Sequence, residues 1–363
     1  MDWNSSGIAH EFTFEAIPAN DLGSSLGLID GVTGFSIVED YRSDYRASMS
    51  LLCDGADIPA NALVRIHHRA TIDGSEFNEA LGTFMQDVAS LTLIRGRYTG
   101  NIDFYSPMIA LGTDIRPNDR GIAAGTKAAA HFESIVSGSF QRPLLSGVST
   151  SAVFPQFHIW EAGASVLSEC HACADAVGGI VNVEPFGGIV LEKYIAPVKR
   201  ANTFDIKAGA ESVTITGLQL TDPERYNKAI AFYDYSQGDT TTRLSASASV
   251  PEWHPWHPSK IGRWITVDVS SDVIDFEEGA TVDQVKTALQ SQVDDSIAAI
   301  AEVRRSLFCS MLYQPIRAGE VGRFNYTDGG QEISTRAILA TREINWSNGS
   351  LTMNCTFEEV GNG

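Results

Sequence analysis

The sequence predicts an α+β fold built mostly from antiparallel strands, with helix-bearing insertions. Two observations carry this prediction: long stretches in which apolar and polar residues alternate at period two, and two segments whose apolar residues recur at the 3.6-residue period of a helix. The chain has 363 residues, more than one ordinary hydrophobic core organises, so several domains are expected.

The first β block runs from Ser36 to about Tyr105 and is punctuated by turn residues. Residues 64–70 separate into two faces, with Val64, Ile66, His68 and Ala70 on one and Arg65, His67 and Arg69 on the other. Because His67 and His68 lie on opposite faces, their imidazoles are not expected to converge on one ligand. Asp73-Gly74 predicts a tight turn after this strand.

A helix followed by a hairpin is predicted in the middle of the chain, as a small α/β module. The apolar stripe of the helix consists of Val166, Leu167, Cys170, Ala174 and Val177. Gly178-Gly179 marks the end of this helix. The hairpin has strands at 180–184 and 189–195, joined by the turn Pro185-Phe186-Gly187-Gly188.

The last third of the chain predicts further strands around one long helix. Strand patterns occur at 213–215, at 265–269 and, most regularly, at 351–358. The helix begins with Thr281 and Gln284 at capping-box spacing and extends to Phe308, a length of roughly 40 Å. Its apolar stripe comprises Val282, Val285, Leu289, Val293, Ile297, Ile300 and Val303.

An internal duplication is also indicated. Residues 86–106 and 341–359 share one pattern, a strand, a turn containing glycine and a second strand.

The charge balance and the cysteines argue against several classes of function. A formal net charge of -19 disfavours tight binding of nucleic acid, whose affinity comes from Lys and Arg neutralising phosphates. No stretch reaches the ~18 consecutive apolar residues of a membrane helix, and the N-terminus lacks the parts of a signal peptide. We therefore expect a protein made in the cytoplasm, whose five cysteines are reduced thiols.

Two motifs have the residue types of a chemical site. Cys170-His171-Ala172-Cys173 has thiol spacing suited to zinc or redox chemistry, but Cys170 lies on the apolar stripe and no second ligand pair completes a tetrahedral set. Core cysteines are therefore favoured over a metal or redox site. The stiff segment 253–258 carries Trp253, His254, Trp256 and His257, for which we favour a connector or a protein contact over a metal or sugar site.

The motif search favours a protein that is not an enzyme and has no cofactor or bound metal. The sequence contains no Gly-x-Ser-x-Gly elbow, no glycine-rich phosphate loop and no His-Glu-x-x-His.

Several passages follow one another in a recognisable order. They are residues 45–52 with 64–66, LGTF at 81–84, GGIVNVEPFGGIVLEKY at 178–194, ERYNKAIAFY at 224–233, SKIGRWITVDVSSDVI at 259–274, the helix from Thr281, and LYQPIRAGEVGRFNY at 312–326. In this order they resemble the central baseplate hub proteins of long-tailed phages, contractile and flexible-tailed, over nearly the whole chain. One departure is Gly319-Glu320, where relatives tend to have Gly-Asp.

The resemblance implies two similar antiparallel β-barrels per chain, with inserted α/β and helical segments. The expected domains are a first barrel at 1–115, an α/β insertion at 116–200, a second, discontinuous barrel at 201–250 and 309–363, and a strand-plus-long-helix insertion at 251–308. Because the chain ends at Gly363, directly after the last strand, no appended lytic domain is expected.

The resemblance also implies a role in the virion, at the tail tip of a siphophage or related phage. A homotrimer would close the tail tube, adapt a threefold tip to a sixfold tail and gate DNA ejection, with an acidic wall that lets DNA slide. Its partners would be the distal tail protein ring, the tape-measure protein and tip fibre or spike proteins. The alternatives are a receptor- or carbohydrate-binding tail protein and a cell-wall hydrolase.

Overall fold

The computed structural model describes residues 3, 8–59, 61–86, 93–94, 97–140, 143–209, 215–221, 226–237, 240–252, 257–270, 281–301, 306–328 and 331–360. Strands dominate and helices are few, which confirms the α+β class. The chain divides into two compact units, Met1–Gln219 with Leu307–Gly363, and Leu220–Ser306. No helix in the described part of the chain is both long and apolar enough to cross a membrane.

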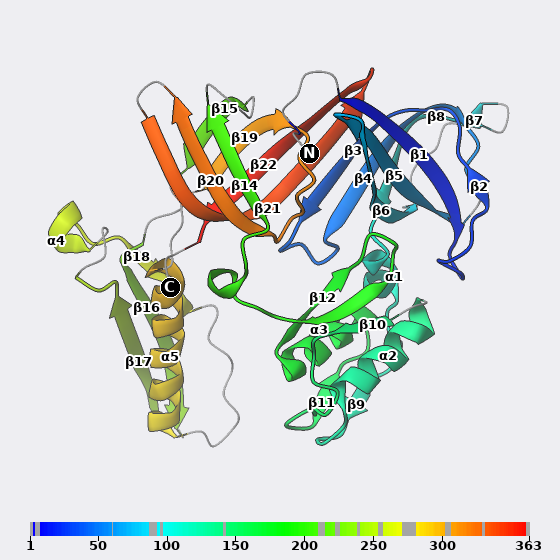
Figure 1. Ribbon diagram of the computed structural model, residues 1–363. Coiled ribbons are helices and arrows are strands. Elements are labelled where there is room, and N and C mark those ends of the chain that lie inside the picture. Colours follow the sequence, from blue (N-terminus) through cyan, green and yellow to red (C-terminus); the bar gives the residue numbers. More distant parts are fainter. Residues whose placement is uncertain are drawn as a thin grey trace. The chain divides into compact units, whose positions relative to one another are not determined.

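The larger unit is built on one sheet of fourteen strands, in two halves. The first half contains β1 (Ala9–Pro18), β2 (Gly27–Leu28), β3 (Val32–Asp40), β4 (Ala47–Ala56), β5 (Ala62–Ile72), β6 (Ser75–Gln86), β7 (Leu93–Ile94) and β8 (Arg97–Tyr105). The second contains β14 (Phe204–Gly209), β15 (Ile215–Thr221), β19 (Ser306–Leu312), β20 (Val321–Asp328), β21 (Gln331–Ser347) and β22 (Ser350–Glu359). Figure 1 shows the two curved halves side by side, joined where β21 pairs antiparallel with β3.

The two halves repeat one strand order. Hydrogen bonding runs β1-β5-β6-β8-β4-β3 in the first half and β14-β20-β21-β22-β19-β15 in the second. When these six strands are numbered along the chain, both orders read 1-4-5-6-3-2. The halves differ in the direction of the first strand, because β1 is antiparallel to β5 whereas β14 is parallel to β20.

The expected closed barrels are not found among the described strands, because the strands of both halves belong to one sheet of fourteen strands. The reason lies in the length of β21. Its first part pairs with β20 and its last part pairs with β3, so the second half of the sheet occupies the edge of the first. One hydrophobic core accordingly runs through both halves, from Phe14 and Ile66 to Phe324 and Met353.

Strand β5 confirms the predicted alternation, with one exception. Val64, Ile66, His68 and Ala70 are buried and Arg69 is exposed, but Arg65 is buried as well. Arg65 is buried because its guanidinium finds polar partners in other segments, which make burial of the charge possible. Asp73 and Gly74 form the predicted tight turn, both with positive φ.

The α/β insertion has its own core. It contains α1 (Met108–Thr113), β9 (Arg120–Ile122), α2 (Ala128–Ser139), β10 (Pro143–Ser146), β11 (His158–Trp160), α3 (Val166–Val177), β12 (Gly179–Val183), β13 (Ile189–Lys193) and η1 (Pro197–Lys199). Helix α3 ends at Gly178, which has the left-handed conformation expected of a C-cap glycine. The predicted hairpin is present as β12 and β13.

The cysteines of α3 lie in this core, as predicted. Cys170 and Cys173 are both fully buried, and burial raises the pKa of both thiols, that of Cys173 to about 12. Both side chains therefore remain protonated near neutral pH, a state that suits packing and disfavours thiolate chemistry.

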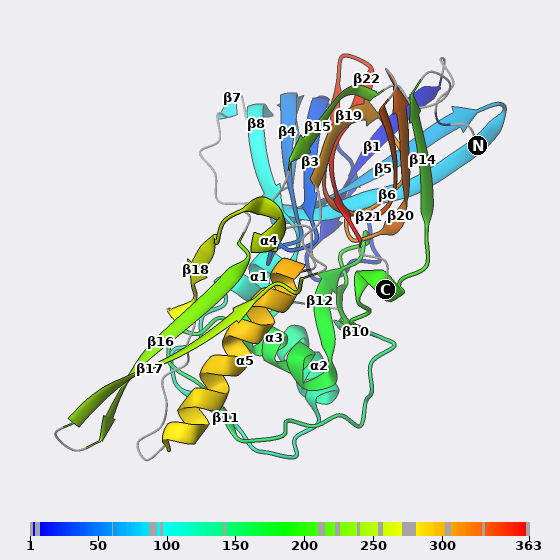
Figure 2. The same ribbon diagram turned by 90° about the vertical axis from the view of Figure 1, so that its left-hand side faces the viewer.

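The smaller unit packs one helix against a hairpin. It contains β16 (Lys228–Gln237), β17 (Thr240–Ser249), α4 (Pro258–Ile261), β18 (Thr266–Asp268) and α5 (Val282–Ala301), and Figure 2 shows α5 lying along β16 and β17. The predicted capping box is present: the Thr281 Oγ1 accepts from the Gln284 N–H at 3.3 Å, and the Gln284 Oε1 accepts from the Thr281 N–H at 2.8 Å.

The predicted length of this helix was wrong. Helix α5 ends at Ala301, and Phe308 lies in β19, where burial alternates at the period of a strand. The described part of the apolar stripe, from Val285 to Ile297, is buried against the hairpin. Val213, Thr214 and Val303 lie outside the described residues. The four predicted domain boundaries stay predictions.

Candidate functional site

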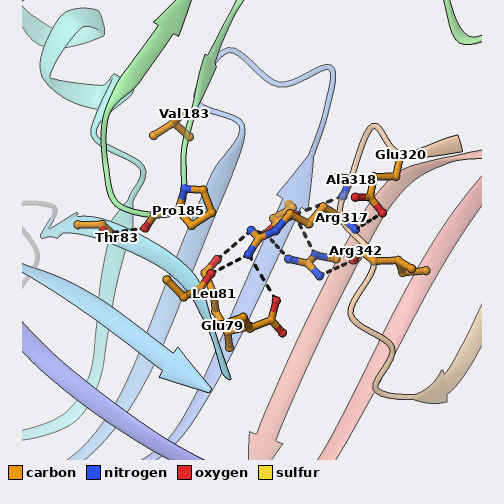
Figure 3. A network of polar contacts seen from close by, with 12 residues as sticks. Glu79, Leu81, Thr83, Val183, Pro185, Arg317, Ala318, Glu320 and Arg342 are labelled. Carbon is orange, nitrogen blue, oxygen red and sulfur yellow. Dashed lines mark hydrogen bonds and ion pairs between the residues drawn. The ribbon is translucent and has the colours of Figure 1, made fainter. Parts of the chain in front are cut away.

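Four of the passages that carry the resemblance, 45–52, 81–84, 178–194 and 312–326, meet at one cleft in the larger unit. The cleft has a volume of about 390 Å³. Its walls come from Leu81–Phe84 on β6, from Glu184 and Pro185 in the β12–β13 turn, and from residues 317–320 between β19 and β20. We call the polar contacts around it the motif junction; its side chains are Glu39, Arg65, Glu79, Thr83, Tyr313, Arg317 and Arg342. Figure 3 labels four of them, Glu79, Thr83, Arg317 and Arg342.

The centre of the motif junction is a buried ion pair across the two halves of the sheet. Arg342 on β21 lies opposite Glu39 on β3 and donates to both of its carboxylate oxygens, at 2.8 and 2.6 Å. A third donor of Arg342 binds the Ile316 carbonyl. Burial alone would raise the pKa of Glu39, but the Arg342 guanidinium and then Arg317 outweigh it and hold that pKa below its usual range.

Arg317 connects the segment after β19 to the first half of the sheet. Its guanidinium donates to the Ala80 carbonyl at 2.6 Å, and lies 3.6 Å from Glu79 and 3.7 Å from Glu39. The Tyr313 hydroxyl also donates to Glu79. Burial acts to raise the pKa of Glu79, but hydrogen bonds from His68 and Tyr313, with the Arg317 charge, lower it.

Arg65 and Thr83 fasten the insertion hairpin to the sheet. The Thr83 hydroxyl donates to the Pro185 carbonyl at 2.8 Å and accepts from the Arg65 Nε at 3.0 Å. The Arg65 Nη2 donates to the carbonyls of Leu22 and Phe186, at 2.8 and 3.0 Å. The turn of the hairpin is thus held by hydrogen bonds from Arg65 and Thr83 to its backbone carbonyls. Because a residue of any type has a backbone carbonyl, these bonds do not depend on the side chains of the turn.

The Gly319-Glu320 pair forms the turn that presents Arg317. Gly319 has φ of +89°, a conformation that favours glycine. The Glu320 carboxylate accepts from the Arg317 N–H at 3.2 Å, which closes the turn on itself.

A histidine pair extends the motif junction toward β1. The rings of His10 and His68 stack with centroids 5.2 Å apart, and the His10 Nδ1 lies 3.0 Å from the His68 Nε2. Burial, followed by the charge of His68, lowers the pKa of His10 to about 4. The predicted divergence of His67 and His68 is confirmed, since His67 contacts Glu15 instead.

The groups of the motif junction hold segments of the chain together. Both Glu39 and Glu79 have lowered pKa values and are paired with arginines, so neither is suited to donate a proton as a general acid at neutral pH. Among the described residues, no three His, Cys, Asp or Glu side chains are grouped so as to hold a metal ion.

The face of the sheet that points away from the main core has a composition of its own. Its strands β8, β4, β3, β21 and β22 are in register across the boundary between the halves. We call it the outer face; its three rows are Asp103-Ser50-Ser36-Asn345-Thr352, Tyr105-Ser48-Val38-Glu343-Asn354 and Asn101-Leu52-Gly34-Ser347-Ser350. These rows contain two acids, many hydroxyls and amides, and neither Lys nor Arg.

Hydrogen bonds hold the carboxylate of the outer face in place. Glu343 accepts from the Ser36 hydroxyl at 3.2 Å and from the Asn354 amide at 3.0 Å. The Ser310 hydroxyl continues this ladder to Asn354 at 2.6 Å. The negative charge of Glu343 is therefore held in place on the outer face, and the rows of this face contain no Lys or Arg to neutralise it.

The predicted contact loop is only partly described. Trp253, His254 and Trp256 lie outside the described residues. His257 caps α4, with its Nδ1 2.7 Å from the Ser259 hydroxyl. Its role in a protein contact stays a prediction.

Sequence reasoning located part of the motif junction and missed the rest. The passages at 81–84, 178–194 and 312–326 were identified as motifs, and the structure brings them together. The burial and pairing of Glu39, Glu79 and Arg342 could not be predicted, because a single charged residue in a strand is normally expected to be exposed to solvent.

Comparison with known proteins shows the fold. No protein-family model matches the chain, and no curated protein is similar to it in sequence. Among solved structures, it is similar to the 43 kDa tail protein of prophage MuSo2 from Shewanella oneidensis, with 12% identity and a TM-score of 0.59. The likeness covers 96% of this chain and 98% of the prophage protein. A tail protein from Neisseria meningitidis gives 14% identity and a TM-score of 0.60, with coverages of 98% and 97%.

A third likeness is to a longer chain. This protein covers 58% of a chain in the half-lidded Francisella PdpA–VgrG complex, at 11% identity and a TM-score of 0.60. The fold of this protein is thus that of phage tail proteins, over nearly its whole length, and the resemblance predicted from the sequence is confirmed at the level of the fold.

Proposed function

We propose that this chain is a structural hub protein of a phage tail tip, in the virion of a long-tailed phage. The observation that carries the proposal is the shared fold, which spans almost all of this chain and almost all of two tail proteins, one of them from a prophage. The motif junction supports it, because its charged groups are engaged in holding segments together.

The hub is a ring of three chains. Each chain contains two halves of the sheet with one strand order, and each half acts as one repeat of the ring. Three chains therefore present six similar repeats, so that a threefold ring docks on a sixfold tube. In this position the ring closes the tail tube beneath the distal tail protein ring and contacts the tape-measure protein and the tip fibre or spike proteins.

The outer face lines the channel of the ring. Its carboxylates and the absence of Lys and Arg from its rows make a surface that repels phosphates, so DNA passes without being held. The net charge of -19 extends the same argument to the whole chain. Gating of DNA ejection then consists of opening this ring or releasing the proteins below it.

Electron microscopy of the purified chain tests the proposal. We expect class averages of a closed threefold ring with a central channel, and the outer face on the channel wall. A ring whose channel wall is basic would contradict the DNA-conduit role, and clearing of host cell walls by the isolated chain in zymography would replace the structural role with hydrolysis.

A further inference from the structure

One hairpin occurs twice in the larger unit, 253 residues apart. In β7 and β8, Leu93 pairs with Tyr98 and Ile94 with Arg97. In β21 and β22, Trp346 pairs with Leu351 and Ser347 with Ser350, the same pairs at the same spacing. The two hairpins of the duplication predicted from the sequence thus share one register at their turns.

The far ends of these hairpins match as well. Met85 pairs with Tyr105 in the first half, and the residues 253 positions later, Ile338 and Glu358, pair in the second. In both hairpins a register shift of one residue separates these pairs from those at the turn. A shared irregularity of this kind indicates that β7 corresponds to the end of β21.

Strands β3 and β15 also correspond, because each is the second strand of its half. They share the sequence Thr-Gly followed by an apolar residue, at Thr33-Gly34-Phe35 and Thr216-Gly217-Leu218. Phe35 and Leu218 both pack against the main core, and Gln219, which corresponds to Ser36, is exposed.

Within the chain, one pair of these edges is joined and the other is not. The end of β21 pairs with β3, with Trp346 opposite Phe35 and Ser347 opposite Gly34. The corresponding edges are β7 and β15. Among the described strands, β7 pairs with β8 alone, and β15 stands at one end of the strand path, beside β19.

We propose that β7 of one chain pairs with β15 of the next copy, repeating between chains the β21–β3 junction found within each chain. By this correspondence Leu93 lies opposite Leu218 and Ile94 opposite Gly217. The inference rests on the proposed ring, whose six repeats are then joined by six equivalent junctions, three within chains and three between them. The contact is heterologous, because two different edges of each chain are used, and three such contacts close a ring when each rotates the next chain by one third of a turn.

Two features favour a second copy as the occupant of these edges. An unpaired strand edge presents free N–H and C=O groups that pair with another strand of matching register. At the junction within the chain, the rings of Phe35 and Trp346 pack with centroids 5.7 Å apart, which seals the core across the boundary. Leu218 opposite Leu93 is an apolar pair at the corresponding place.

Cross-linking between chains tests the pairing. The double variant Ile94→Cys, Gln219→Cys is treated with a bifunctional thiol reagent. The length of the reagent is about two spacings between neighbouring strands, each of ~5 Å. The five native cysteines are buried and are therefore not expected to react with the reagent. For the double variant we expect linked dimers and trimers on a denaturing gel. When the two single variants are mixed, we expect linked dimers and no larger species.

A matched control comes from the second half of the sheet. Ser347 is exposed and corresponds to Ile94, but its edge is occupied by β3. The pair Ser347→Cys, Gln219→Cys therefore gives no link between chains. Light scattering on each variant before the reagent is added shows whether rings are intact.

Each outcome decides a different claim. Rings that form but do not link through Ile94→Cys and Gln219→Cys overturn this interface and leave the hub standing. Linking of either single variant to itself overturns the heterologous contact. A chain that remains monomeric and unlinked at every concentration overturns the proposed ring together with this interface.

Discussion

Removing the buried guanidinium at the motif junction gives the sharpest test of how the two halves of the sheet are held together. In Arg342→Met the Glu39 carboxylate loses both of its shortest hydrogen bonds, and the Ile316 carbonyl loses a donor. Arg342 is completely buried, so water does not replace it. Loss of one partner of a buried ion pair costs about 3–5 kcal/mol.

The expected loss lies at the lower end of that range. Glu39 keeps an ion pair with Arg317 at 3.7 Å and a hydrogen bond from the Ala318 N–H at 3.3 Å, which partly compensate its charge. We therefore expect Arg342→Met to lower the free energy of unfolding by about 3 kcal/mol. This is a large share of the ~5–15 kcal/mol that stabilises a typical domain.

Urea unfolding followed by far-ultraviolet circular dichroism measures this loss. The matched control is Arg42→Met, which breaks the exposed ion pair with Glu358 and is expected to cost about 0–1 kcal/mol. Adding Glu39→Gln to Arg342→Met removes the stranded charge, so the double variant is less destabilised than the two single losses combined. Equal, small effects for Arg342→Met and Arg42→Met would refute this role of Arg342.

Three further predictions follow from other parts of the structure. Neutral His10 stacked on His68 has its pKa lowered from 6.5 to about 4, so its contribution to stability is complete above pH 6.5 and is lost as the pH falls toward 4. Allowing for its partial exposure, the loss is on the order of 1–2 kcal/mol, and urea titrations at several pH values should show it in the native chain but not in His10→Phe. Thr281→Ala removes the capping box of α5 and should cost about 1 kcal/mol, seen as lower protection of its first turn in hydrogen exchange, whereas Thr281→Ser should not. Arginine at Ser50 and Asn345 on the outer face should slow DNA ejection from assembled particles without reducing their yield, and an unchanged rate would remove this face from the channel.

Local features of the fold could be predicted from the sequence because short-range physics determines them. The alternation on β5, the Asp73-Gly74 turn and the capping box at Thr281 each depend on residues a few positions apart. The length of α5 could not, because the sequence beyond Ala301 continues with residues that also suit a strand.

The motif junction was beyond sequence reasoning for a different reason. Glu39 meets Arg342, and Glu79 meets Tyr313, across more than two hundred residues of chain. Pairing of this kind follows from the register of β3 against β21, which no local pattern encodes. The burial of Arg65 is the same case, since its partners come from Leu22, Thr83 and Phe186.

The mass of the purified chain in solution tests the central claim most directly. Light scattering across a concentration series should give a particle of three times 39.2 kDa, the mass of a closed ring. A mass of 39.2 kDa at every concentration would contradict the account, because two repeats in a single chain cannot match a sixfold tail.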